Sequence, residues 1–285
     1  MIKLIRIKFC LLCVLSILSI EINAQTQLHH ANSDLPGVNK NYNLLVHVAV
    51  DSTLRNPIVS ETQMEKIISE LNNFFSPIRV SFSVCEFNVL EDDYSLGRVD
   101  LQPLTQSEQL EELEVRFSLR RRINIYILDY IEGAACGIST FESIVTDLAA
   151  NIFVETTCDE PLSGQIAHHL GHTFGLRNTF DASTIELVDG SNCATTGDLI
   201  CDTPADPFGQ ALTEEEEEMA ENGILQAAFI NSNCEFIYEV RDPNGEFYQP
   251  DVGNIMSGYP CKCGFTQDQF KLMVETILSS EIKHF

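Results

Sequence analysis

Positive charge is scarce in this sequence of 285 residues. It has 17 Lys and Arg residues against 42 Asp and Glu residues, and its formal net charge is −25. A polyanion repels nucleic acids and anionic membrane surfaces, so we expect no nucleic-acid partner. The acidity is compatible with a cationic partner or with bound calcium, and it does not decide between them.

Long apolar runs are also lacking, apart from one at the N-terminus. Basic residues precede the apolar run 9–20, and the small residue Ala24 follows it. This order is typical of a secretory signal peptide. The alternative is an uncleaved anchor, but a run of about a dozen residues is short for a bilayer that takes roughly 20. We predict a signal peptide at residues 1–24, secretion to the extracellular space and no membrane span.

Internal repeats are absent, and the remainder of the chain is long enough for one domain with a sizeable core. Residues 25–40 lack hydrophobic periodicity and are predicted to form a linker or a short pro-segment. The domain is expected to occupy residues 41–285. Nothing in the sequence indicates an oligomeric state.

Cysteine is the residue type that points to cross-links. Cys10 and Cys13 lie in the predicted signal peptide, and an even number of cysteines remains after its removal. In an exported chain an even number favours disulfides, although some could instead be free buried thiols. The remaining cysteines are Cys85, Cys136, Cys158, Cys193, Cys201, Cys234, Cys261 and Cys263.

Hydrophobic patterns divide the chain into a regular first part and an irregular second part. Strands are predicted at 44–50, 80–84 and 123–128, and helices at 61–75, 108–117, 162–176 and 265–277. Their alternation predicts an α+β fold with a mixed sheet backed by helices. Residues 178–260 are rich in Asp, Gly, Pro and Cys and are predicted to be mostly loops, with one acidic helix start at 213–218.

The segment from Gln165 to Phe180 carries the candidate chemistry. His168 and His172 are four residues apart, so on a helix both imidazoles project from one face about 5–6 Å apart. This spacing suits two ligands of one zinc ion. Gly175 permits a tight turn that would bring Asn178 back toward the same metal. The alternative is that the histidines are structural and that no metal binds.

This segment resembles the extended zinc motif H-E-x-x-H-x-x-G-x-x-H of the metzincins, and its surroundings are similar to the pappalysin family of secreted metallopeptidases. The resemblance covers roughly residues 42–280. Further matching motifs are Thr179-Phe180, Gly197-Asp198, Asp202-Thr203-Pro204, Asn254-Ile255-Met256-Ser257, Cys261 and Phe265-Thr266. The resemblance implies a two-lobed metzincin (zincin-like) fold with a mixed sheet, an active-site helix and a loop-rich, disulfide-bearing lower lobe, in which a turn at Met256 lies beneath the metal.

The resemblance also implies cofactors and cross-links. Zinc would be held by His168, His172 and the third ligand position, Asn178. In the family, calcium and disulfides steady the lower lobe. Asp198 and Asp202 are the candidate calcium ligands here, with the alternative that Asp202-Thr203-Pro204 simply caps a turn. The candidate disulfide cysteines are Cys193, Cys201, Cys234 and Cys261, and the resemblance implies a bond between Cys234 and Cys261.

The sequence departs from the family pattern at its reactive positions, whereas the structural positions Gly175 and Met256 match. His169 replaces the glutamate that acts as general base. Asn178 replaces the third histidine, and a neutral amide oxygen is a poor zinc ligand. The tyrosine two residues after the turn methionine is Gly258, and Tyr259 follows one step later.

A zinc peptidase needs a carboxylate to accept a proton from the attacking water, and none stands at residue 169. We therefore predict weak zinc binding, little or no peptidase activity, and a role as a binding protein for a peptide or protein held in the cleft. The alternative is an active zinc metalloendopeptidase with atypical site residues.

Overall fold

The computed structural model describes residues 35, 37–51, 56–90, 98–100, 108–132, 136–139, 149–180, 184–208 and 229–280. The predicted signal peptide, most of the segment 25–40 and the predicted helix start at 213–218 lie outside these residues. Among the described helices, none is both long and apolar enough to cross a membrane.

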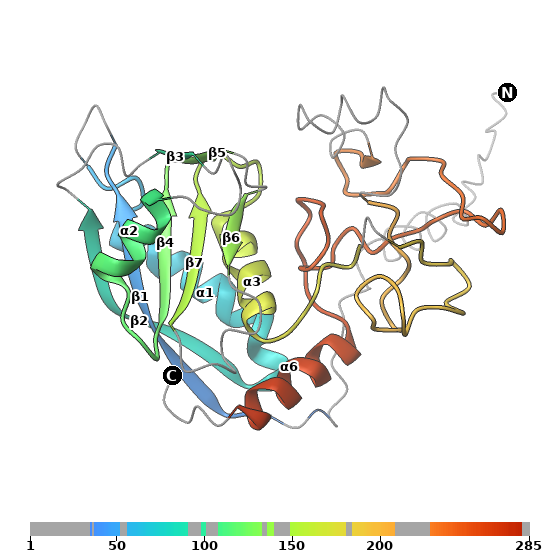
Figure 1. Cartoon of the computed structure of the whole chain (residues 1–285), viewed down its shortest axis with the longest axis horizontal. Coiled ribbons are helices and arrows are strands. Elements are labelled where there is room, and N and C mark those ends of the chain that lie inside the picture. The colour runs from blue at the N-terminus through green and yellow to red at the C-terminus, as the bar shows by residue number, and fades with distance from the viewer. Residues whose placement is uncertain are drawn as a thin grey trace, which may run out of the picture.

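A five-stranded sheet forms one half of the molecule (Figure 1). Its strand order is β2-β1-β4-β7-β6. The first four strands pair in parallel, and β6 pairs antiparallel with β7 at one edge. The bounds are β1 Lys40–Ala49, β2 Val80–Leu90, β4 Ile123–Leu128, β6 Gly137–Ser139 and β7 Ala150–Glu155; two short strands, β3 Arg98–Asp100 and β5 Tyr130–Glu132, pair with each other.

The central strands are buried on both faces. Every residue of β4 and β7 is buried, as expected for parallel strands covered by helices on both sides. Both strands are rich in β-branched and aromatic residues, which favour the extended backbone. Because β6 and β7 are adjacent at one edge of the sheet, they bring the segment 137–139 beside the helix that follows β7.

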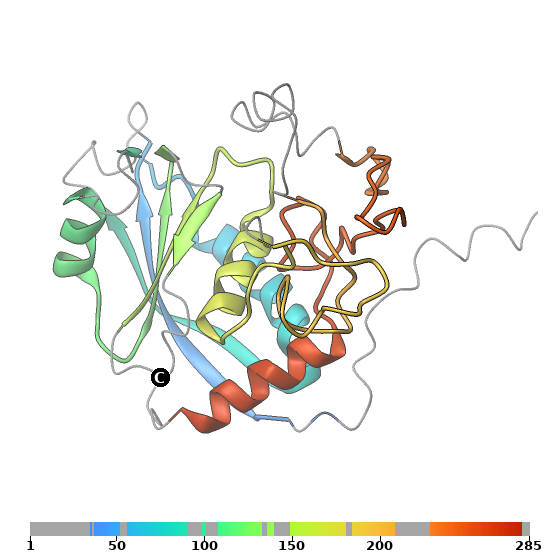
Figure 2. The same ribbon diagram turned by 45° about the vertical axis from the view of Figure 1, so that its right-hand side comes forward.

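Helices cover both faces of the sheet (Figure 2). Helix α2 (Glu108–Phe117) packs on one face through Leu110 and Leu113. Helices α1 (Glu61–Phe75), α3 (Leu162–Thr173) and α6 (Gln267–Ser279) share the core on the other face. Capping boxes begin α1 and α6, which lowers the cost of starting each helix. The α+β prediction with a mixed sheet is thereby confirmed.

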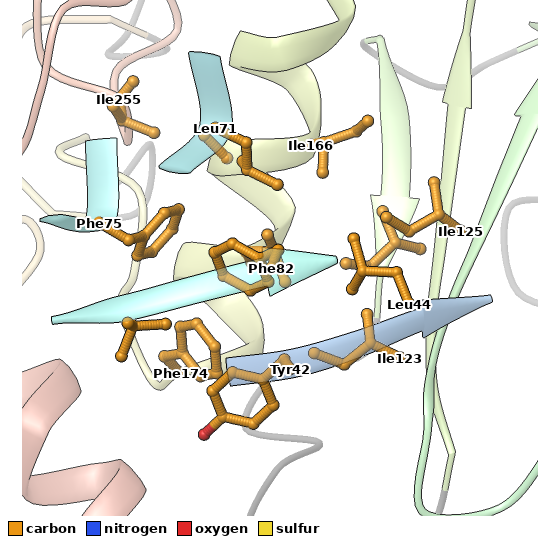
Figure 3. Packing of buried hydrophobic residues seen from close by; sticks show 14 of the residues in the cluster. Tyr42, Leu44, Leu71, Phe75, Phe82, Ile123, Ile125, Ile166, Phe174 and Ile255 are labelled. Carbon is orange, nitrogen blue, oxygen red and sulfur yellow. The ribbon is translucent and has the colours of Figure 1, made fainter. Parts of the chain in front are cut away.

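Aromatic side chains fill the core between the sheet and these helices (Figure 3). Phe174, at the end of α3, lies with its ring centroid 5.4 Å from Tyr42 of β1 and 5.9 Å from Phe75 of α1. Phe265, just before α6, lies 5.2 Å from Phe75. The core therefore fixes the C-terminal end of α3, which carries the histidines, and the start of α6.

The described residues after α3 contain no long helix or strand until α6, as predicted. Figure 1 shows these loops beside α3, on the side away from the sheet. Disulfides join Cys193 to Cys201 and Cys234 to Cys261, and a third joins Cys136 to Cys158 near β6. Cys85 and Cys263 are free and exposed. A small cluster around Phe229, Val252 and Tyr259 is the local core of the loops.

Candidate metal centre

His168 and His172 lie one turn apart on α3, and their rings face each other. The two Nε2 atoms are 3.0 Å apart, and the ring centroids are 4.6 Å apart. The helix ends at Thr173, earlier than the predicted 176, because Gly175 adopts a positive φ of 92° and turns the chain. The structure therefore brings together the two histidines that the sequence selected.

Backbone carbonyls fix the orientation of both rings. His168 Nδ1 lies 2.8 Å from the carbonyl oxygen of Ile255, and His172 Nδ1 lies 2.8 Å from that of Leu176. A carbonyl only accepts hydrogen bonds, so each Nδ1 carries a proton and each neutral ring keeps its lone pair on Nε2. This is the arrangement by which proteins orient imidazole ligands of a metal.

Burial keeps these rings neutral. It is the main cause that lowers the pKa of His168 well below its ordinary value, and it also lowers the pKa of His172. Two neutral rings with lone pairs 3.0 Å apart repel each other unless a cation lies between them.

Asn178 presents the third polar atom of the site. Its Oδ1 atom is buried and has no hydrogen-bond partner among the described residues. An orphaned carbonyl oxygen and two imidazole lone pairs fit a metal cation. The set is neutral, however, and the described residues contain no group of three or more His, Cys, Asp or Glu side chains that could hold a metal.

The turn at Met256 packs directly against α3. A side-chain carbon at Gly171 would come within 2.4 Å of Met256 Sδ, so glycine lets the helix and the Met256 side chain approach this closely. The carbonyl of Met256 accepts from the Thr179 amide at 3.1 Å. Because the preceding carbonyl, that of Ile255, orients His168, the turn supports the candidate metal centre.

His169 is turned toward the edge strand β6. Its Nδ1 lies 2.9 Å from Ser139 Oγ, and its Nε2 would lie 2.5 Å from a side-chain carbon at Gly137. The residue is only 6% exposed, and burial lowers its pKa to about 3, with smaller contributions from His172 and Lys262. At neutral pH His169 is therefore uncharged, and one of its nitrogens is already engaged by Ser139.

Tyr259 has a different partner. It is fully buried, and its hydroxyl donates to Asp206 Oδ1 at 3.0 Å. Asp206 also accepts from Thr179 Oγ1 at 2.7 Å. A side-chain carbon at Gly258 would lie 2.6 Å from the Phe208 ring. The tyrosine hydroxyl is thus committed to a buried carboxylate.

The two candidate calcium ligands play separate roles. Asp198 is buried and accepts from the Ile200 amide at 2.9 Å and from Gln269 Nε2 at 3.3 Å. Asp202 is exposed and accepts from the Asp268 amide in the first turn of α6 at 2.9 Å. Glu186, which the sequence did not single out, is buried near Asp198, and burial together with Asp198 and Asp206 raises its pKa to about 8. Calcium binding stays a prediction.

Sequence reasoning also missed Lys262. Its side chain is 3% exposed, and Nζ lies 3.8 Å from Glu160 Oε2. No sequence pattern predicts a role for Lys262, because its partner Glu160 lies before α3 and is brought close to it only by the fold.

A family model described as pregnancy-associated plasma protein-A matches residues 120–278, more than half of the chain. The chain belongs to this family. The matched residues include all of β4, β6, β7, α3 and the Met256 turn, so the pappalysin resemblance predicted from the motifs is confirmed. The pappalysins are zinc metallopeptidases, and this member presents two histidines and an asparagine where a third zinc ligand would be a histidine.

A curated protein is similar to part of the chain. An extracellular metalloprotease of Colletotrichum graminicola is 25% identical over 174 residues, which are 55% of this chain and 55% of that protein. The chain thus spans about half the length of this relative.

Solved structures resemble the chain only loosely. Metalloproteinase-II from Bacteroides fragilis aligns with a TM-score of 0.33 and 8% identity, covering 67% of this chain and 54% of its own. A chain in the structure of a chaperone-substrate complex aligns with a TM-score of 0.37 and 11% identity, covering 86% of this chain and 36% of its own. Both scores are too low to support an argument about function.

Proposed function

We propose that this protein is a secreted pappalysin homologue that binds zinc weakly, does not hydrolyse peptides and acts by holding a peptide or protein segment. The observation that carries the proposal is the environment of position 169. An imidazole stands there instead of a carboxylate, and it is buried, neutral and bonded to Ser139.

The site has side chains that could bind a metal, but it lacks a side chain suited to act as the general base in hydrolysis. His168 and His172 would hold zinc through Nε2, with Asn178 Oδ1 as a weak third donor. Bound zinc would supply a positive charge that polarises a water or a carbonyl group. A general base contributes typically ~10²–10⁴ to the rate, and a neutral ring with a pKa of about 3 is a poor proton acceptor.

Two further features support a binding role. The hydroxyl of Tyr259 is held by Asp206, so the group that would stabilise a developing negative charge is occupied. Strand β6 forms an edge of the sheet beside His169, and an extended peptide can add to such an edge by main-chain hydrogen bonds.

Secretion is part of the same proposal. The three disulfides among the described residues suit an oxidising compartment. The order of charged, apolar and small residues at 1–24 suits a cleaved signal, and the relative from Colletotrichum graminicola is described as extracellular. The domain would then occupy residues 41–285, with the loop-rich segment as the lower lobe of a metzincin-type fold.

Zinc content and hydrolysis together test the proposal. Purified protein should retain less than one equivalent of zinc after dialysis, and the double variant His168→Ala/His172→Ala should retain none. Neither protein should cleave a denatured protein substrate when zinc is supplied. Equal zinc content in the wild type and the double variant would instead indicate that the histidines are structural.

The second candidate function is an active zinc endopeptidase with atypical residues. The Ser139 hydroxyl on His169 favours it, because that bond holds the imidazole in a fixed position near the histidine pair. Cleavage that a chelator abolishes, and that is lost on His169→Ala while zinc content is kept, would establish this candidate and reject the first.

A further inference from the structure

Lys262 places a buried positive charge next to the candidate metal centre. It follows Cys261 in the segment after the Met256 turn, and its side chain is 3% exposed. Burying an ammonium group costs several kcal/mol unless the charge is paired and hydrogen-bonded. Lys262 meets both conditions, because Nζ donates to the Ser257 carbonyl at 2.5 Å and lies 3.8 Å from Glu160 Oε2.

The beginning of α3 leaves room for this pair. A side-chain carbon at Gly164 would lie 2.9 Å from Lys262 Cγ and 2.9 Å from Glu160 Oε1. The lysine stem also lines a cavity of about 270 Å³ together with Pro161, Gly164 and the Cys234–Cys261 disulfide. The ion pair is therefore wedged between the first turn of α3 and the turn that supports the metal centre.

The Lys262 side chain is held beside the histidines. Its stem lies against Gly164, where a side-chain carbon would come within 2.9 Å of Cγ, and Gly164 precedes His168 by one turn on the same face of α3. Its Nζ donates to the Ser257 carbonyl, two residues after the Ile255 carbonyl that orients His168. The ligand atoms themselves are neutral, so no carboxylate in the set offsets the ammonium. A divalent cation at the same place would be repelled with twice the energy of a monovalent one.

We propose that Lys262 determines the metal affinity of this site: its ammonium, anchored by Glu160 and the Ser257 carbonyl, opposes the binding of a divalent cation by His168 and His172. The proposal rests on the metal centre of the proposed function. It assigns the weakness of zinc binding to two separate causes, the missing third histidine and a fixed like charge.

An electrostatic role and a purely structural role of Lys262 predict opposite effects of its removal on zinc affinity. Without the ammonium, repulsion disappears and zinc should bind more tightly. If Lys262 only held the Met256 turn through Ser257, its removal would loosen the support of His168, and zinc would bind more weakly. Glu160 gives the complementary change, because Glu160→Gln leaves the ammonium without its counter-charge and should weaken zinc binding.

The experiment is a zinc titration in competition with a chromophoric chelator. Lys262→Met should raise zinc affinity by about tenfold or more, the scale on which groups behind metal ligands act, and Glu160→Gln should lower it. Lys271→Met is the matched control, because Lys271 is exposed on α6 and pairs with Asp268; it should change nothing. Thermal melts would confirm that each variant is folded.

Unchanged or weaker zinc binding by folded Lys262→Met would overturn the proposal, as would the absence of zinc binding in both the wild type and this variant. If Lys262→Met failed to fold, stronger or unchanged binding by Glu160→Gln would overturn it equally. Hydrolysis is not the readout. Peptidase activity of the wild type would reject the proposed function and leave the affinity result standing.

Discussion

At residue 178, a single side chain limits the donor strength of the candidate metal centre. The Oδ1 atom of Asn178 is already buried without a partner next to His172, and the Gly175 turn has already brought the chain there. Asn178→His should therefore raise zinc affinity by itself, because an imidazole nitrogen is a stronger zinc donor than an amide oxygen. A competition titration would measure the change, with Asn178→Ala as the control that removes the donor.

Restoring hydrolysis requires more than this ligand. His169→Glu alone should do little, because base and metal act as one unit. The double variant Asn178→His/His169→Glu should cleave a denatured protein measurably. Deleting Gly258 to advance Tyr259 should not help further, because that tyrosine is bonded to Asp206 and packed against Phe208. No cleavage by a double variant that binds zinc tightly would show that these two changes are not sufficient for the reaction.

His47, on β1, is a residue away from the candidate metal centre that should make stability sensitive to acid. It is 2% exposed, neither ring nitrogen has a hydrogen-bond partner among the described residues, and it stacks on Tyr126 at 4.7 Å. Burial lowers its pKa from 6.5 to about 4. Between these values the unfolded chain takes up a proton that the folded chain refuses, so the free energy of unfolding falls as the pH drops from 6.5 toward 4.

The effect should reach about 2–3 kcal/mol at pH 4.5, since one pKa unit corresponds to about 1.4 kcal/mol. His47→Leu removes the group, so the difference in unfolding free energy between pH 7 and pH 4.5 should shrink by that amount. Urea denaturation at the two pH values measures it. Equal losses in the wild type and the variant would show that other groups cause the acid sensitivity.

At the scale of elements, the contact between α3 and the Met256 turn has no spare room. Gly171→Ala would place a carbon 2.4 Å from Met256 Sδ, and such overpacking costs typically about 1–3 kcal/mol. The melting temperature should fall. Zinc affinity should fall as well, because the displaced turn carries the Ile255 carbonyl that orients His168.

Calorimetry and a zinc titration would check the two effects. Glu65→Ala, at an exposed position of α1, is the control and should change neither. A Gly171→Ala variant as stable as the wild type would mean that the Met256 side chain can move aside without loss.

Some helices and strands could be predicted from the sequence and others could not. The helices at 61–75 and 108–117 and the strand at 123–128 were predicted with the bounds observed, because their periodicity and turn signals are local. Strands β6 and β7 were missed. β6 has only three residues, and the apolar run of β7 carries no alternation, since both of its faces are buried.

The site divides in the same way. His168, His172 and Asn178 could be selected because helix geometry and one glycine bring them together over a short stretch of chain. Three contacts could not be predicted, because each joins segments that are distant in the sequence and become neighbours only in the folded protein. They are the pairs Lys262–Glu160, Tyr259–Asp206 and His169–Ser139.

For the whole molecule, the scarcity of positive charge makes the place of Lys262 informative. The chain has 17 basic residues against 42 acidic ones, yet one lysine is buried beside a set of neutral ligands. Exposed positive charge would be screened by water and salt, whereas a buried ammonium keeps its influence on its neighbours. The net negative charge of the chain therefore does not determine the charge near the candidate metal centre, where the buried Lys262 is positive.

The Cys234–Cys261 disulfide, the pairing that the family resemblance implies, joins the loops to the segment that bears Lys262. It closes a loop across a sequence separation of 27 residues, for which the loss of chain entropy in the unfolded state corresponds to roughly 3–4 kcal/mol. The variant Cys234→Ser/Cys261→Ser should be destabilised by about this amount.

Cys263→Ser should be included in both proteins compared, so that the nearby free thiol cannot form a new bond. Cys85→Ser, at an exposed free cysteine of β2, is the control. Urea denaturation of the oxidised proteins would measure the difference, and zinc affinity should fall together with stability, because the released segment no longer fixes the Met256 turn. A variant that loses stability but keeps its zinc affinity would show that the turn is held by its contact with α3 alone.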